Sequence, residues 1–147
     1  GRERRETPRK FPAFDPASGR SLEPAFSAAG SAEVEAACAL AHAAFDAYRE
    51  LPPQRRALFL EAIAKHILAQ GEPLLQRAHS ETALPLPRLE GERARTANQL
   101  RLFAAELRSG EWLGLRVDPA MPQRQPAPRA DLRQRKIALG PVAVFGA

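Results

Sequence analysis

The sequence predicts an α/β chain that is mostly helical, with four helices placed between a short N-terminal strand pair and two C-terminal strands. Four stretches repeat apolar residues at helical spacing between proline and glycine stops, which is typical of amphipathic helices. The runs on either side combine apolar residues with turn formers, which is typical of strands. With 147 residues, 44% of them apolar and 27% charged, the chain is about one domain long.

The N-terminal part predicts a leader followed by a hairpin. Residues 1–10 are charged and hold no apolar anchor, so they are predicted to form a flexible leader. The next stretch, "FPAFDPASGRSLEPAF" (residues 11–26), alternates apolar residues with turn formers. A turn between two short strands is predicted at Asp15, Pro16, Ser18 and Gly19.

Two amphipathic helices are predicted to follow. Ser31 is predicted to cap the first helix. The helix face expected to pack against the core carries an apolar stripe: Val34, Cys38, Ala41, Phe45 and Tyr48. Pro52 and Pro53 end this helix and start the second. The second helix ends at Gly71, and its stripe consists of Leu60, Ile63, Ile67 and Leu68.

The third and fourth helices are separated by two prolines. The third begins near Pro73, and the segment 84–87 breaks it. The fourth runs from about Arg88 to Arg108 and stops at Gly110. Its predicted core residues are Leu89, Leu100, Phe103 and Leu107.

The C-terminal part is predicted to be extended. Residues 113–130 hold four prolines and predict a connector, so 11–130 is expected to be the helical part plus this connector. Residues 131–139 predict an exposed strand. Residues 140–147, "GPVAVFGA", predict a strand covered on both faces. Because such a strand needs neighbours on both edges, we expect this chain to be part of a longer protein.

Composition disfavours several classes of function. The single cysteine excludes an internal disulfide, and no apolar run is long enough to span a bilayer, so we expect a cytoplasmic protein without a membrane segment. The net charge of +5 is concentrated in residues 1–10 and 116–136, a leader and a proline-rich connector. Such placement favours solvated surface charge over nucleic-acid binding.

No side chain stands out as catalytic. Cys38 lies on the apolar stripe of the first helix, where a thiol is expected to be a small core residue. His42, His66 and His79 lie on three different helices without a second ligand at metal-binding spacing, so no metal site is predicted. There is no glycine-rich phosphate loop and no Gly-x-Ser-x-Gly elbow, so no catalytic or cofactor-binding residue is predicted.

The order of several motifs is more informative than any one of them. The motifs are "FDPASG", "AAFDAYR", "RALFLEAIAKHILAQG", "ETALPLPRLEGERARTANQLRLFAAELRSGEWLG" and "LGPVAVFGA". Together they resemble the N-terminal part of the aldehyde dehydrogenase superfamily, and within it the α-ketoglutarate-semialdehyde (2,5-dioxovalerate) dehydrogenases. The resemblance covers residues 11–147 and departs from the family pattern at Ala138, where proline is common.

The resemblance implies a larger protein. A subunit would be about three times this length, with cofactor-binding, catalytic and oligomerisation domains, and this chain would be roughly its first third. The helices would lie at the outside of the cofactor-binding domain, residues 131–139 would join the oligomerisation sheet of a homo-oligomer, and 140–147 would be the first strand of the cofactor-binding sheet. The catalytic cysteine, glutamate and asparagine would lie beyond residue 147, so we expect the chain alone to be inactive.

The resemblance also implies a reaction and a substrate entrance. The parent enzyme would oxidise an aldehyde, with α-ketoglutarate semialdehyde as the expected substrate, and would reduce NAD or NADP. The stretch "GERARTANQ" would border the entrance, and helical spacing places Glu92, Arg95, Thr96 and Gln99 on one side of it. Arg95 is expected to hold the distal carboxylate of the substrate. The alternative is a solvated helix face on which Glu92 pairs with a neighbouring arginine.

A second class of function stays open on the residues alone. The four helices could form a non-catalytic interaction module whose basic ends bind an acidic partner or nucleic acid. The coding sequence beyond residue 147 distinguishes the two, because an Asn-Phe-Pro segment and a later reactive cysteine would favour the dehydrogenase and a stop codon would favour the module.

Overall fold

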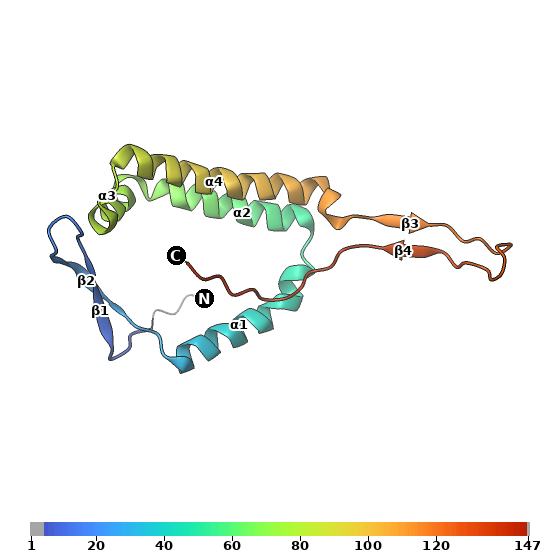
Figure 1. Ribbon diagram of the computed structural model, residues 1–147, viewed down its shortest axis with the longest axis horizontal. Helices are drawn as coiled ribbons and strands as arrows, with labels where there is room; N and C mark the ends of the chain where they lie inside the picture. The colour runs from blue at the N-terminus through green and yellow to red at the C-terminus, as the bar shows by residue number, and fades with distance from the viewer. Residues whose placement is uncertain (1–4, 147) are drawn as a thin grey trace.

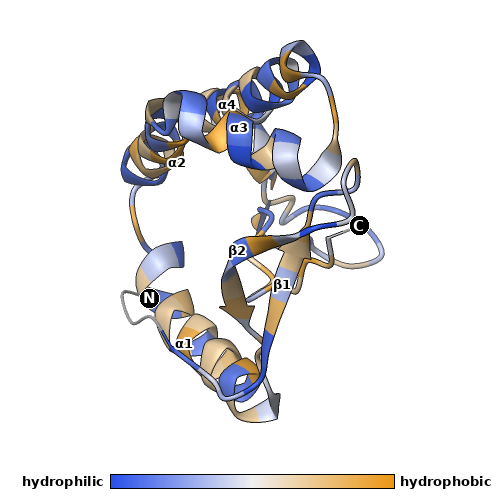
Figure 2. Cartoon of the chain, turned by 90° about the vertical axis from the view of Figure 1, so that its left-hand side faces the viewer, coloured by the Kyte–Doolittle hydropathy of each residue, from blue (hydrophilic) through white to orange (hydrophobic). Residues whose placement is uncertain are grey.

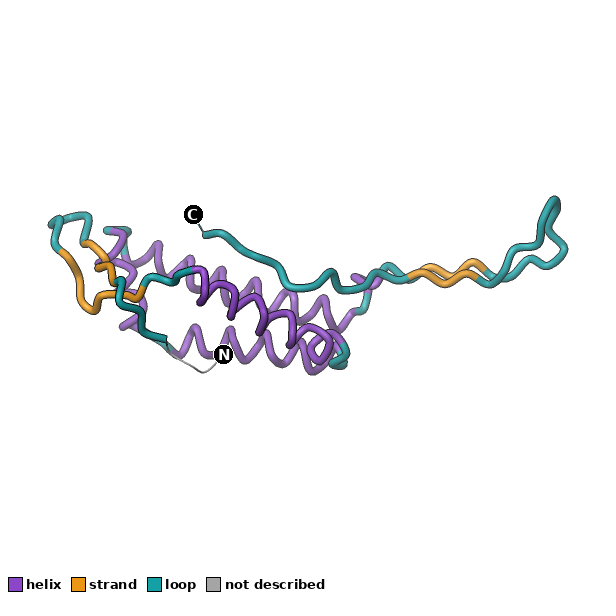
Figure 3. The backbone as a smooth tube through the Cα atoms, turned by 90° about the horizontal axis from the view of Figure 1, so that it is seen from below, coloured by secondary structure: helices purple, strands orange, loops and turns teal. Residues whose placement is uncertain are grey.

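The computed structural model describes residues 5–146 and places two antiparallel helices at the centre of the chain (Figure 1). A hairpin lies near one end of this pair, and a second hairpin projects from the other end as a long arm (Figures 1 and 3). The elements in chain order are β1 (Lys10–Phe14), β2 (Ser21–Ser27), α1 (Ser31–Arg49), α2 (Pro53–Ala69), α3 (Gly71–Thr82), α4 (Leu86–Ser109), the 3₁₀ turn η1 (Glu111–Leu113), β3 (Arg116–Asp118) and β4 (Leu132–Gln134).

The predicted N-terminal hairpin is confirmed. Strands β1 and β2 pair antiparallel, from Lys10 opposite Ser27 to Phe14 opposite Ser21. The carboxylate of Asp15 organises the turn by accepting hydrogen bonds from the Ser18 hydroxyl at 2.7 Å and the Ala17 amide at 2.8 Å. These two bonds, the Ser18 hydroxyl first, lower the pKa of Asp15. The hairpin is therefore fixed by the turn residues that predicted it.

The leader is more ordered than the sequence predicts over the part that the structure describes. The Thr7 amide donates to Ser27 Oγ at 3.2 Å, and the Thr7 hydroxyl donates to the Ala28 carbonyl at 2.8 Å. The Ala28 amide in turn donates to the Arg9 carbonyl at 2.8 Å. These bonds extend the β1–β2 pairing backwards into the segment that was predicted to be flexible, of which residues 1–4 lie outside the described residues.

Helix α1 begins where predicted but is capped differently. Ser31 is its first helical residue rather than its cap, and Gly30 occupies the cap position. The Glu33 carboxylate accepts a hydrogen bond from the Gly30 amide at 2.8 Å. A carboxylate in the first turn thus satisfies the backbone amide of the cap residue, whereas the predicted Ser31 cap would have accepted from backbone amides two or three residues farther along.

The apolar stripe of α1 is not part of the core. The helix stands apart from the α2–α4 pair along most of its length (Figure 1), and Figure 2 shows hydrophobic residues along it. Cys38 is exposed, which corrects its predicted core position, and Val34 and Tyr48 are exposed as well. The edge of the Tyr48 ring meets the Phe59 ring of α2, with centroids 6.0 Å apart. Burial of this stripe requires a neighbouring element that the described residues do not place there.

The core is a seam of small residues between α2 and α4. Four alanines are completely buried, and on each helix the two are seven residues apart, so they lie on one face: Ala57, Ala64, Ala97 and Ala104. Leu75 of α3 and Leu89 of α4 complete the buried apolar set among the described residues. Side chains as small as alanine let the two helix backbones approach closely.

The predicted helix stops are confirmed at prolines and glycines. Pro52 caps α2 and Pro53 is its first residue, while Gly110 ends α4 with a left-handed φ of 73°. Helix α3 begins at Gly71, slightly earlier than predicted. The predicted core face of α4 is only partly correct, because Leu89 is buried whereas Phe103 is 52% exposed. The seam uses the alanines of α4 instead of its phenylalanine.

The predicted connector contains a strand that the sequence reasoning missed. Strand β3 pairs antiparallel with β4, with Val117 opposite Arg133. Farther out, Met121 and Arg129 form an isolated antiparallel bridge. Residues 116–134 therefore form an arm rather than a loose connector, and the predicted strand 131–139 is confined to β4.

The described residues 140–146 form no strand, which differs from the buried strand predicted for 140–147. Their side chains are strongly exposed, with Leu139 just before them at 97% and Phe145 at 93%. Because an extended segment becomes a strand only when another strand pairs with it, the apolar pattern alone cannot produce one here. Residue 147 lies outside the described residues. No helix in the described part of the chain is both long and apolar enough to cross a bilayer.

Candidate functional site

The candidate entrance residues lie on the outer face of α4. On the opposite, inner face of this helix, Ala97 is completely buried and the half-buried Arg93 donates from Nη1 to the Gly71 carbonyl at 2.9 Å. This bond holds α4 against the junction of α2 and α3. The four predicted residues share the exposed face: Glu92, Arg95, Thr96 and Gln99. The structure brings them together as the helical spacing predicts.

Arg95 is engaged by its neighbour on the same helix. Its Nη2 and Nε atoms lie 2.9 and 3.0 Å from Glu92 Oε2, in a pair that is 79% exposed at Arg95 and 47% exposed at Glu92. The Thr96 hydroxyl donates to the Glu92 carbonyl at 2.9 Å. The observed pair is the one that the solvated-face alternative predicts. Because a guanidinium has five N–H donors, the pair still leaves donors on Arg95 for a further carboxylate.

The remaining candidates are dispersed. His42 and His66 are exposed on α1 and α2, and the exposed His79 of α3 uses Nδ1 to donate to the Leu84 carbonyl at 2.7 Å. Cys38 is exposed on α1. Among the described residues, no three histidine, cysteine or acidic side chains gather as metal ligands would. The His79 bond contributes to the end of α3.

Sequence reasoning missed one polar cavity, which we call the arginine cavity. It lies where α1 meets α2, and its walls include Arg56, Trp112 and Arg135. The only sequence signal was the excess of basic residues at 116–136, which was assigned to surface charge. Arg56 and Trp112 are 56 residues apart in the sequence, and Trp112 and Arg135 are 23 apart. Such long separations produce no sequence pattern, so the cluster is recognised only in the folded chain.

The helices and short strand pairs are those of an α/β fragment, and sequence comparison shows the family to which it belongs. The chain belongs to the aldehyde dehydrogenase family, whose family model matches residues 3–146. This confirms the family resemblance that the motif order indicates.

Two relatives show where in the family the chain lies. It is 57% identical over 136 residues to alpha-ketoglutaric semialdehyde dehydrogenase 2 of Azospirillum brasilense. The aligned region covers 92% of this chain and 26% of the relative. It is 52% identical over 122 residues to alpha-ketoglutaric semialdehyde dehydrogenase of Acinetobacter baylyi. The aligned region covers 83% of this chain and 23% of that relative. The chain therefore spans about a quarter of the length of the curated relatives it matches, a smaller share than the third that the resemblance implies.

Proposed function

We propose that the whole protein is a nicotinamide-dependent aldehyde dehydrogenase that oxidises α-ketoglutarate semialdehyde to the corresponding dicarboxylic acid. One observation carries this proposal: the 57% identity to a relative named for this substrate, over 92% of the chain. In the overall reaction the aldehyde carbon gains an oxygen from water, and its hydride passes to NAD or NADP.

The described residues do not fit the cofactor. A dinucleotide is usually cradled at a glycine-rich turn between a parallel strand and a helix, where backbone amides face the pyrophosphate. The described residues contain only antiparallel strand pairs, and none of these feeds a glycine-rich turn into a helix. The described residues therefore supply no cofactor contact of this kind. The contribution of this chain is the scaffold built on the α2–α4 seam.

The test is a steady-state assay of the full-length protein. We expect reduction of NAD or NADP that depends on α-ketoglutarate semialdehyde, with a higher kcat/KM than for an uncharged aldehyde of similar length. Parallel titrations with the two nucleotides give the cofactor preference. Absence of nicotinamide reduction with every aldehyde tested would refute the proposal.

We also propose that the exposed face of α4 borders the substrate entrance and that Arg95 binds the distal carboxylate. The support is the cluster of polar side chains on this face and the unused donors of Arg95. Replacing Arg95 with alanine in the full-length enzyme should lower kcat/KM for the semialdehyde by about tenfold, because a charge-assisted hydrogen bond is lost. Arg101→Ala is the matched control, since Arg101 is exposed on the same helix and donates to Asn98 at 3.2 Å. Equal losses on charged and uncharged aldehydes would exclude the carboxylate contact.

Finally, we propose that the arm assembles the protein into a homo-oligomer. Support comes from the exposed edges of the β3–β4 pair, whose backbone groups can pair with another strand. Proline at Arg133 removes one strand amide and should lower the molar mass measured by light scattering. An unchanged molar mass in this variant would show that the strand is not the contact.

A further inference from the structure

Basic side chains outnumber acidic ones in the lining of the arginine cavity. It encloses about 300 Å³ between the α1–α2 corner, the η1 turn and residues 135–138. Four of its lining residues are basic and one is acidic: Arg49, Arg56, Arg135, Lys136 and Glu50. Such a cavity is large enough for a small ion or for the head of a side chain.

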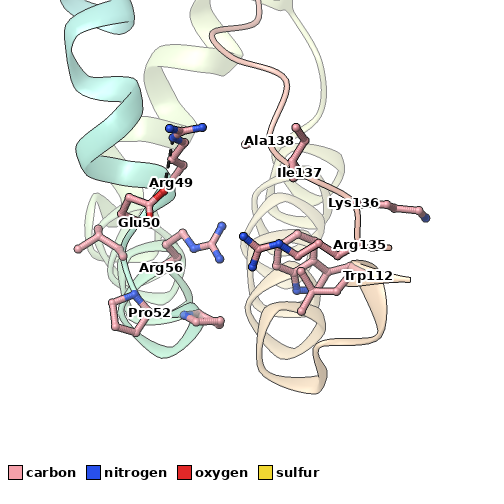
Figure 4. Close-up of a pocket in the computed structure, with 12 residues that line it drawn as sticks. Arg49, Glu50, Pro52, Arg56, Trp112, Arg135, Lys136, Ile137 and Ala138 are labelled. Carbon is pink, nitrogen blue, oxygen red and sulfur yellow. Dashed lines mark ion pairs between the residues drawn. The ribbon is translucent and has the colours of Figure 1, made fainter. Parts of the chain in front are cut away.

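The two central arginines face each other. In Figure 4 the guanidinium groups of Arg56 and Arg135 point toward one another across the cavity, whereas the Lys136 side chain points away from it. Within the described residues, neither Arg56 nor Arg135 forms an ion pair. The one acid in the wall is already used, because Arg49 Nε lies 3.5 Å from Glu50 Oε1. The two like charges therefore lack a counter-charge between them.

Two hydrogen-bond donors of the cavity also lack acceptors. Arg56 Nε and Trp112 Nε1 are both buried and have no hydrogen-bond partner within the described residues. The two side chains contact each other, since Arg56 Cζ lies 5.3 Å from the centre of the Trp112 ring. This cation–π contact favours the arginine charge but gives neither N–H an acceptor. Buried donors without acceptors are uncommon in folded proteins because each costs free energy.

The wall that carries Arg135 is held by the backbone. The Lys136 amide donates to the Leu113 carbonyl of η1 at 2.8 Å. This bond fixes residues next to Arg135 beside the turn that carries Trp112. The cavity is thus formed by parts of the chain that are bonded to each other rather than by a chance approach of side chains.

We propose that the arginine cavity binds an oxyanion, a carboxylate or a phosphate group, between Arg56 and Arg135, with the Trp112 indole N–H as a further donor. An oxyanion supplies the acceptors that Arg56 Nε and Trp112 Nε1 lack, and its negative charge offsets the two facing guanidiniums. Arg56 is half-buried and Arg135 is exposed, so solvent screens part of the repulsion between them, and an anion bound between the two groups offsets the part that remains. The inference does not depend on the aldehyde that the enzyme oxidises.

Removing the charge of Arg135 tests this site, because the thermal midpoint changes in opposite directions with and without a bound anion. If the cavity holds no anion, Arg135→Gln relieves repulsion between like charges and leaves the thermal midpoint of the full-length protein unchanged or raised. If an anion is bound, the same substitution removes half of its counter-charge and lowers the midpoint. Arg124→Gln is the matched control, because Arg124 is an exposed arginine of the arm whose side chain has no partner among the described residues. Arg135→Lys keeps the charge and should lie between the wild type and Arg135→Gln.

Inorganic phosphate distinguishes two sources of the anion. If the site takes a free anion, phosphate raises the midpoint of the wild type and of Arg124→Gln by several degrees more than that of Arg135→Gln. If an acidic side chain of the same protein fills the site, phosphate acts equally on all variants, while Arg135→Gln still has the lower midpoint. Either result supports the proposal. It is overturned if Arg135→Gln is as stable as the wild type or more so and phosphate acts on all variants alike.

Discussion

Enlarging one alanine of the seam should destabilise the α2–α4 pair. Ala97 is completely buried, and no side chain larger than alanine is fully covered in the described chain. Leucine at this position adds three carbon atoms where the two helices are in close contact. Overpacking of this kind typically costs about 1–3 kcal/mol. The intrinsic helix preference changes little, since alanine and leucine are both strong helix formers.

The measurement is urea unfolding of the chain followed by circular dichroism. For a loss of about 2 kcal/mol and a denaturant slope of about 1–3 kcal/mol per molar, the midpoint of Ala97→Leu should fall by roughly 1 M. Ala105→Leu is the matched control, because Ala105 is exposed on the same helix. This control should change the free energy of unfolding by less than about 0.5 kcal/mol. If the two variants unfold at the same urea concentration, the helices are not packed closely at Ala97 and the seam argument is wrong.

Three further predictions concern single contacts. The hydrogen bonds from Arg108 lower the pKa of Glu61, so the stability difference between wild type and Glu61→Gln should be present at neutral pH and vanish as the pH falls through that lowered pKa. Arg77→Ala should speed amide hydrogen exchange in the β1–β2 hairpin. The Arg77 guanidinium donates a hydrogen bond to the Glu23 carbonyl of β2 and lies over the Phe26 ring of the same strand. Gly110→Ala should cost about 1–2 kcal/mol in urea unfolding, owing to its left-handed φ, whereas Gly91→Ala inside α4 should gain about 0.5–1 kcal/mol.

Each of these three has a result that contradicts it. A stability difference for Glu61→Gln that persists unchanged into acid would mean that the carboxylate charge is not what Arg108 stabilises. Unaltered exchange in the hairpin after Arg77→Ala would mean that other contacts hold it. Equal effects at the two glycines would show that backbone conformation does not govern them, since an added Cβ meets nothing within 4 Å at either position.

Features set by local chemistry were predictable from the sequence. The hairpin turn follows from Asp15 and its neighbours, and the helix boundaries follow from Pro53 and Gly110, because these residues restrict or permit particular backbone angles. The shared face of Glu92 and Arg95 follows from helical spacing in the same way. Each of these inferences needs only residues within a few positions of each other.

Features set by distant contacts were not predictable in this way. The apolar stripe of α1 predicts that this face packs against another element of the protein. Cys38 on this stripe is exposed, because the helix pattern does not determine whether such an element lies there. Phe103 was favoured for the core by its size, yet the seam selects alanines since the two helices pack closely. The three-residue strand β3 lies in a proline-rich stretch and gives no periodic signal of its own. The arginine cavity joins residues from three separate parts of the chain.

The projecting arm offers a position for reporter groups. Its outer end, residues 122–128, lies beyond the bridge between Met121 and Arg129 and far from the helices (Figures 1 and 3). A fluorophore attached at Gln123 would therefore leave the alanine seam undisturbed. If the arms pair between subunits as proposed, energy transfer between two such labels follows their assembly and dissociation in real time.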